Sequence, residues 1–171
     1  AYLSGMAALV NHDAWDVADA ATGYLESITN IIDADKLEPV EAAFRQIATP
    51  RFARLAGATD PGSSLLRQRM QRFLIVMAKD QQMREPLARQ ASARIGLDGE
   101  ADPQAAAPSE LETILSVGVQ DIGEPFFDLL LQQAIDSEDP AFRNAALGAL
   151  ARVEDPPLVA KLQAAFLGGN L

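Results

Sequence analysis

The stretch Asp80-Gln-Gln-Met83-Arg84 returns further along the chain as Asp139-Pro-Ala-Phe142-Arg143. In each copy an Asp stands where a helix would begin, an apolar residue follows three positions later, and an Arg follows four positions later. Such an Asp can accept hydrogen bonds from the free amides of the first turn, and the Arg can pair with a neighbouring carboxylate. We therefore predict that Asp80, Arg84, Asp139 and Arg143 are structural repeat pairs in stacked helical hairpins.

Apolar residues on both sides of this match recur at steps of three and four, as in amphipathic helices. The clearest series are Ala18, Ala21, Leu25, Ile28 and Ile32; Leu37, Val40, Phe44 and Ile47; and Leu66, Met70, Phe73 and Met77. No alternating strand pattern competes with them. The sequence predicts an all-α fold of about eight or nine helices, since every apolar series has the helical period. We expect antiparallel hairpins stacked into a HEAT- or armadillo-like α-α superhelix.

Proline, glycine and serine suggest where these helices begin and end. We expect Pro50 to break or kink the helix that stops at Gly57. The next helix is predicted to follow Ser63 or Ser64, and Pro108-Ser109 is predicted to cap a later one. Residues 1–171 are interpreted as one helical-repeat domain with first helices in 1–57, a middle hairpin in 63–96, a loop in 97–108 and C-terminal hairpins in 109–167.

The ends and the composition exclude some classes of protein. Residues 1–5 have no starting Met and no charged leader, so we expect a piece of a longer chain and no targeting signal. The net charge of −10 argues against a nucleic-acid partner, and no apolar run is long enough to suggest a membrane partner. The absence of cysteine excludes disulfides and thiolate chemistry, and it leaves cytoplasm and periplasm equally open.

Basic residues are concentrated between positions 45 and 94. They are Arg45, Arg51, Arg54, Arg67, Arg69, Arg72, Lys79, Arg84, Arg89 and Arg94. One interpretation is that they lie on solvated helix faces, as surface charges usually do. The other is a basic wall that faces an anionic group on a partner.

Residues for catalysis or metal binding are missing. A zinc hydrolase needs two or three His, Cys or carboxylate ligands at fixed spacing, and this chain has one histidine, His12. No serine has the setting of a catalytic nucleophile, and Gly118 to Gly123 lacks the Lys-Ser/Thr that would complete a phosphate-binding loop. We predict no catalytic, metal-binding or cofactor-binding residue, and no enzyme activity for this chain alone. His12 is interpreted as a cap or surface residue, and Trp15 as a core anchor.

Arg84 is unusual for a charged residue, because it falls inside the apolar arc set by Leu87, Ala88, Ala91 and Ile95. A buried guanidinium must be paired. We expect an Asp of the same or an adjacent repeat as its partner, and a ligand role is the alternative.

Several short sequence elements occur in an order that is similar to that of a known protein family. They are Trp15 heading a long helix, Leu66-Arg67, Asp80…Arg84…Ala88, Pro108-Ser109-Glu110-Leu111, Gly123-x-x-x-Phe127, Ala149-Leu150, and Asp155-Pro156 followed by Leu158 and Leu162. From Trp15 to Leu167 the chain resembles the C-terminal half of the helical domain of zinc aminopeptidases related to puromycin-sensitive and endoplasmic-reticulum aminopeptidases. The family's His-Glu-x-x-His and Gly-x-Met-Glu-Asn motifs do not occur here, so no catalytic residue is carried over.

The resemblance implies a non-catalytic bowl of helical repeats that closes over an upstream catalytic domain of the same polypeptide, which holds the zinc. The bowl encloses the peptide substrate and takes part in opening and closing. Arg67, Arg69 and Arg72 are then candidates to face the peptide. The alternative is a stand-alone HEAT-like scaffold that binds another protein along its concave face.

Overall fold

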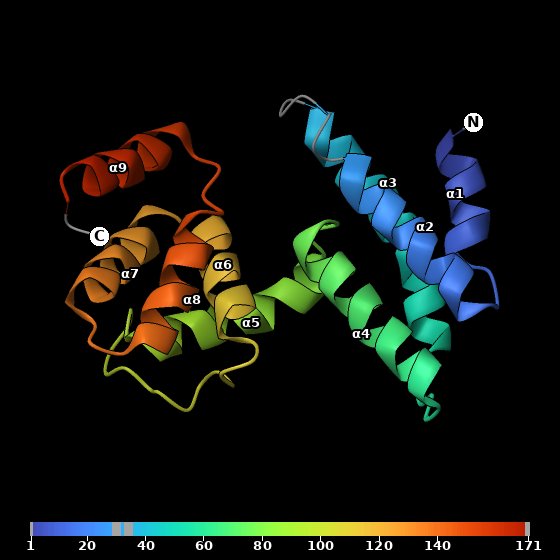
Figure 1. The fold of residues 1–171 in the computed structure, drawn as a ribbon, viewed down its shortest axis with the longest axis horizontal. Helices are drawn as coiled ribbons and strands as arrows, with labels where there is room; N and C mark the ends of the chain where they lie inside the picture. Colours follow the sequence, from blue (N-terminus) through green and yellow to red (C-terminus); the bar gives the residue numbers. More distant parts are fainter. Residues whose placement is uncertain (1, 29–31, 33–35, 170–171) are drawn as a thin grey trace. The chain divides into compact units, whose positions relative to one another are not determined.

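The computed structural model describes residues 2–28, 32 and 36–169, with Tyr2 described by its backbone alone. Within these ranges every regular element is an α-helix (Figure 1). The nine helices are α1 (Tyr2–Val10), α2 (Trp15–Ile28), α3 (Leu37–Arg54), α4 (Pro61–Val76), α5 (Gln81–Ile95), α6 (Leu111–Asp121), α7 (Glu124–Asp136), α8 (Pro140–Leu150) and α9 (Pro156–Leu167). The all-α prediction is confirmed for the part of the chain that is described.

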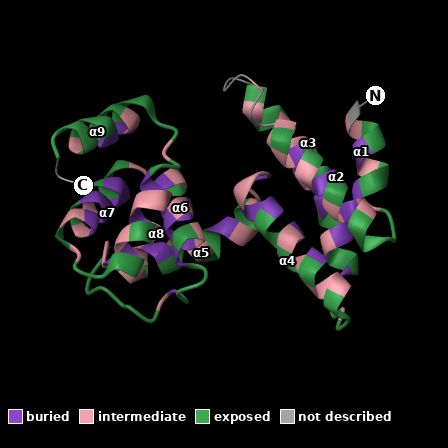
Figure 2. Cartoon of the chain, viewed as in Figure 1, coloured by how far each residue is buried: buried purple, intermediate pink, exposed green. Residues whose placement is uncertain are grey.

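The chain divides into two compact units, Ala1–Met83 and Arg84–Leu171. Each unit has its own hydrophobic core, with the buried residues on the inward faces of its helices (Figure 2). The boundary falls inside the range 63–96, for which a single hairpin was predicted.

The first unit is built from two helical hairpins, α1–α2 and α3–α4. Besides these pairs, α1 packs on α3 and α2 packs on α4. Trp15 at the start of α2 lies against Gly62 at the start of α4, and Glu26 near the end of α2 pairs with Arg69 further along α4. Therefore α2 and α4 run parallel, as equivalent helices of successive hairpins do. This packing is consistent with an α-α superhelix.

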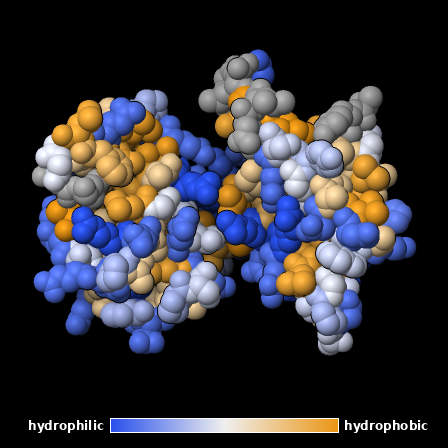
Figure 3. Space-filling view, in the orientation of Figure 1, coloured by the Kyte–Doolittle hydropathy of each residue, from blue (hydrophilic) through white to orange (hydrophobic). Residues whose placement is uncertain are grey.

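The second unit is built around the contacts of α6, α7 and α8. Phe126 and Phe127 are fully buried, and the ring of Phe126 lies directly against Gly118 of α6. An added Cβ at Gly118 would lie 2.3 Å from Phe126 Cζ, so a glycine is required for this approach. On α9, apolar side chains remain at the surface, where Phe166 is 53% and Leu167 is 90% exposed (Figure 3).

Several predicted helix boundaries are corrected. The helix predicted to follow Ser63 or Ser64 begins at Pro61, because the Asp60 carboxylate accepts a hydrogen bond from the Ser63 amide at 2.9 Å and Pro61 suits the first helical position. Ser109 is not a cap, since α6 begins after Glu110. Pro50 does not break α3. It lies on the exposed side of that helix, where water can replace the missing backbone donor.

Other helix boundaries agree with the prediction from the sequence, and one helix was not predicted. The predicted stops at Gly57 and Gly96 are confirmed, and both glycines have the positive φ typical of a helix C-terminus, 79° and 74°. Helix α1 was not predicted. Ile32 lies beyond the end of α2, and the residues between it and Ile28 are outside the described ranges.

Candidate functional site

The three candidate peptide-facing arginines lie on α4, but they do not share a face. The guanidinium of Arg67 lies over the Phe52 ring, 4.7 Å from its centroid. Arg69 turns to α2, where its Nη2 is 3.1 Å from Glu26 Oε2. Arg72 is exposed, and no side-chain partner is found for it among the described residues. Of the three, Arg72 alone has a guanidinium without a partner in the described part of its unit.

Arg69 also contacts a second carboxylate of α2. Its Nε lies 3.0 Å from Asp19 Oδ1. That nitrogen is buried and has no hydrogen bond of good geometry among the described atoms, so the Asp19 contact is an ion pair only. Two carboxylates therefore neutralise Arg69 where α2 and α4 meet.

Other basic residues of the segment are also used inside the first unit. Arg51 is 7% exposed, and its Nη2 donates to the Asp13 carbonyl at 3.1 Å. Arg54 donates to the carbonyl and the side chain of Asn11, both at 2.9 Å. These contacts attach α3 to the link between α1 and α2. Arg51 and Arg54 therefore have partners within the first unit, whereas a basic wall that faces an anionic partner stays a prediction.

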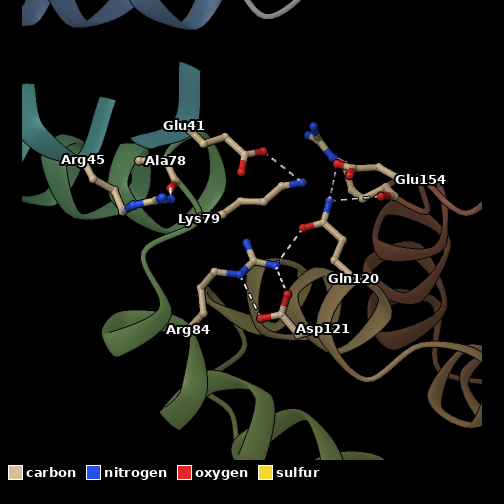
Figure 4. Close-up of polar contacts among 9 residues, drawn as sticks. Glu41, Arg45, Ala78, Lys79, Arg84, Gln120, Asp121 and Glu154 are labelled. Carbon is tan, nitrogen blue, oxygen red and sulfur yellow. Dashed lines mark hydrogen bonds and ion pairs between the residues drawn. The ribbon is translucent and has the colours of Figure 1, made fainter. Parts of the chain in front are cut away.

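Arg84 is the centre of a polar cluster in the second unit. Its Nε donates to Asp121 Oδ2 at 2.9 Å, and its Nη2 donates to Asp121 Oδ1 at 2.7 Å and to Gln120 Oε1 at 2.9 Å. Gln120 Nε2 in turn donates to the Arg152 carbonyl at 3.1 Å and to Glu154 Oε1 at 3.2 Å (Figure 4). The cluster joins α5, α6 and the link that follows α8.

The predicted burial and carboxylate pairing of Arg84 are thus confirmed, since its side chain is 0% exposed. The sequence did not identify Asp121 as the partner. The one local feature of Asp121 that could have pointed to Arg84 is its position as the last residue of α6. A cation near this end also interacts favourably with the negative end of the helix dipole.

The repeat pairs agree at their Asp residues and differ at their Arg residues. Asp80 Oδ1 accepts from the Met83 amide at 3.1 Å, and Asp139 Oδ1 accepts from the Ala141 amide at 2.9 Å, so both cap a helix. Arg84 is buried, whereas Arg143 is only half-buried and has no hydrogen-bond or ion-pair partner among the described residues. Equivalence of the two sites in stacked hairpins stays a prediction.

His12 and Trp15 both lie near the start of α2. His12 is exposed, and its Nδ1 accepts from the Ala14 amide at 3.1 Å, next to the start of α2. Trp15 is 50% exposed, so the interpretation as a core anchor is wrong; it covers Gly62 with one side of its ring. Across the described ranges, no cluster of three or more His, Cys, Asp or Glu side chains is arranged to hold a metal ion.

Asp60 and Lys161 have shifted pKa values, and both make their contacts at the surface of the protein. The backbone hydrogen bond from Ser63 lowers the pKa of the Asp60 carboxyl. The hydrogen bond to Asp128 raises the pKa of the Lys161 ammonium, and Glu124 adds to the effect. Neither group lies among a set of catalytic side chains. None of the described helices combines the length and the apolar character needed to cross a membrane.

The sequence was also compared with models of known protein families. A family model described as the ERAP1-like C-terminal domain matches residues 1–171. The chain belongs to this family. The resemblance drawn from the sequence is thereby confirmed, and membership supports a non-catalytic C-terminal domain of an aminopeptidase. Neither the curated proteins nor the solved structures include a significant match to this ERAP1-like C-terminal domain.

Proposed function

We propose that this domain is the accessory part of a zinc aminopeptidase, which encloses the peptide beyond its N-terminus and takes part in opening and closing. The observation that carries the proposal is the family match over residues 1–171. The zinc and the catalytic residues would lie in an upstream domain of the same polypeptide. This chain would act on parts of the substrate remote from the cleaved bond, and such contacts can influence turnover as well as binding.

The surface of the first unit supports a contact with anionic groups of a peptide. Arg72 is exposed on α4 and pairs with no carboxylate among the described residues of its unit, whereas Arg69 is neutralised by two carboxylates. An unpaired guanidinium is a good partner for a carboxylate, because it can donate two parallel hydrogen bonds. We therefore assign the peptide-facing role to Arg72 ahead of Arg67 and Arg69.

The test uses the longer polypeptide that carries the upstream domain. The kcat/KM is measured for a single-residue amide and for peptides of increasing length, in the wild type and in Arg72→Glu. We expect Arg72→Glu to lower kcat/KM for long peptides by about 3–10-fold, the effect of one exposed charge contact and its reversal. The single-residue amide should be cleaved at the wild-type rate.

The matched control is Gln71→Glu, which adds a negative charge at the neighbouring exposed position of α4. A loss as large as that of Arg72→Glu would indicate a general field effect and not a contact. Deletion of the whole domain should also weaken cleavage of long peptides more than of the amide. Equal losses on all substrates would leave it a structural support, and the absence of any zinc motif upstream would favour the stand-alone scaffold.

A further inference from the structure

The link between α4 and α5 contains a residue in an unfavourable backbone conformation. Lys79 has φ of 46°, and it is the one non-glycine residue with positive φ among those described. A side chain with a Cβ is disfavoured there. Glycine is the usual residue at such a position after a helix. A lysine persists in this conformation only where its surroundings hold it.

The conformation of Lys79 lets one short turn end α4 and begin α5. The Asp80 amide donates to the Leu74 carbonyl at 2.9 Å, which closes the last turn of α4. The Asp80 carboxylate then accepts from the Met83 amide at 3.1 Å, which caps the start of α5. Both hydrogen bonds depend on the direction that the chain takes at Lys79.

Two side chains of α3 hold this turn. Lys79 Nζ lies 3.2 Å from Glu41 Oε1, and the two side chains are only 22% and 15% exposed. Four residues along α3, the Arg45 guanidinium donates a hydrogen bond to the Ala78 carbonyl (Figure 4). Two consecutive residues of the link, Ala78 and Lys79, are therefore bound by side chains from neighbouring turns of α3. Partial burial protects the ion pair from the screening that weakens exposed pairs.

We propose that Glu41, Arg45 and Lys79 form a conformational latch. While Glu41 and Arg45 hold the link, Lys79 stays in the left-handed region and the tight turn is kept. When the ion pair opens, Lys79 relaxes to an ordinary backbone conformation, and the direction in which the chain leaves α4 changes. A domain that opens and closes needs a two-state element of this kind, and only that use of the latch rests on the proposed function.

Amide hydrogen exchange of residues 77–80 tests the latch on this chain without any substrate. Lys79→Met keeps the length of the side chain and removes its charge, and Glu41→Gln removes the charge of its partner. We expect exchange at Asp80 to become about tenfold faster or more in both variants, since local opening is no longer opposed by the ion pair. Lys79→Gly should stay near the wild-type rate, because glycine adopts positive φ without steric cost.

Lys161→Met is the matched control, since it removes a lysine that is paired with Asp128 on the surface of the other unit. It should leave exchange at Asp80 unchanged. Equal acceleration in Lys79→Met and Lys79→Gly would reduce the contact to an ordinary ion pair and overturn the latch. So would an unchanged rate in Glu41→Gln, which also decides the matter if Lys79→Met does not fold.

Discussion

Arg84 and Asp121 form a two-pronged ion pair, with Nε 2.9 Å from Oδ2 and Nη2 2.7 Å from Oδ1. The Arg84 side chain is fully buried, and that of Asp121 is 22% exposed. The pair joins the first turn of α5 to the last residue of α6. Because a buried charge without a partner is costly, removing one member of this pair should destabilise the second unit.

Arg84→Ala should therefore destabilise the protein more than Arg89→Ala. We expect a difference of about 1–3 kcal/mol in the free energy of unfolding, because Arg84→Ala removes buried hydrogen bonds to a carboxylate. Arg89 pairs with Glu85 on the surface, where both side chains are largely exposed, so its loss should have little effect. Denaturant unfolding followed by circular dichroism measures both. Equal stabilities would show that Arg84 is not held as described.

Gly118→Ala should destabilise the second unit although alanine favours helix. Its Cβ would lie 2.3 Å from Phe126 Cζ in the core, and overpacking of this kind costs about 1–3 kcal/mol. Gly148→Ala is the control, because its Cβ would meet only the flexible Glu112 side chain, 2.9 Å away at Cδ. That variant should be neutral or slightly more stable. Thermal unfolding compares the two, and similar melting temperatures would contradict the close approach of α6 and Phe126.

Asp60 should contribute stability that depends on pH. The Ser63 amide lowers its pKa below the ordinary 3.8 in the folded state. The contribution is therefore present above pH 3.8 and is lost as the pH falls through the folded-state pKa. An NMR titration of the Asp60 carboxyl should show the lowered pKa. Asp60→Ala should be less stable than the wild type at neutral pH, and the difference should shrink in acid.

Asp155→Ala provides the comparison for Asp60, because Asp155 stands at the same position before α9 without a capping hydrogen bond. It should have the smaller effect on stability at neutral pH. If the two variants were equally destabilised, the Ser63 hydrogen bond would not be the cause of the Asp60 effect.

The isolated chain should bind no zinc stoichiometrically and cleave no aminoacyl reporter substrate. It has one histidine and no cysteine, and scattered carboxylates are poor substitutes for imidazole at a catalytic zinc. Metal analysis of the purified chain and an assay with an aminoacyl amide measure both. One tightly held zinc per chain would contradict the non-catalytic assignment.

Most helices could be predicted because their signals are local. The series that contains Leu66, Met70 and Phe73 marks the buried face of α4, and all three are buried. Helix α1 was missed, since Tyr2–Val10 has no charged residue and thus no polar face to set the period. Helix α4 begins before the predicted start at Ser63 or Ser64, because Asp60-Pro61 opens it, as Asp-Pro also opens α8 and α9.

The sequence by itself determined the all-helical class, the Asp80 and Asp139 caps and the burial of Arg84, because each depends on residues within a few positions along one helix. The tertiary structure alone decided which charged side chains pair with one another and which remain available to bind a partner. Glu26 and Arg69 are 43 positions apart, and Arg84 and Asp121 are 37 apart. An ion pair requires contact within a few ångströms, and no local pattern specifies which distant helices will supply it. For that reason the sequence offers Arg67, Arg69 and Arg72 as equal candidates, whereas among the described residues Arg67 and Arg69 have partners and Arg72 has none.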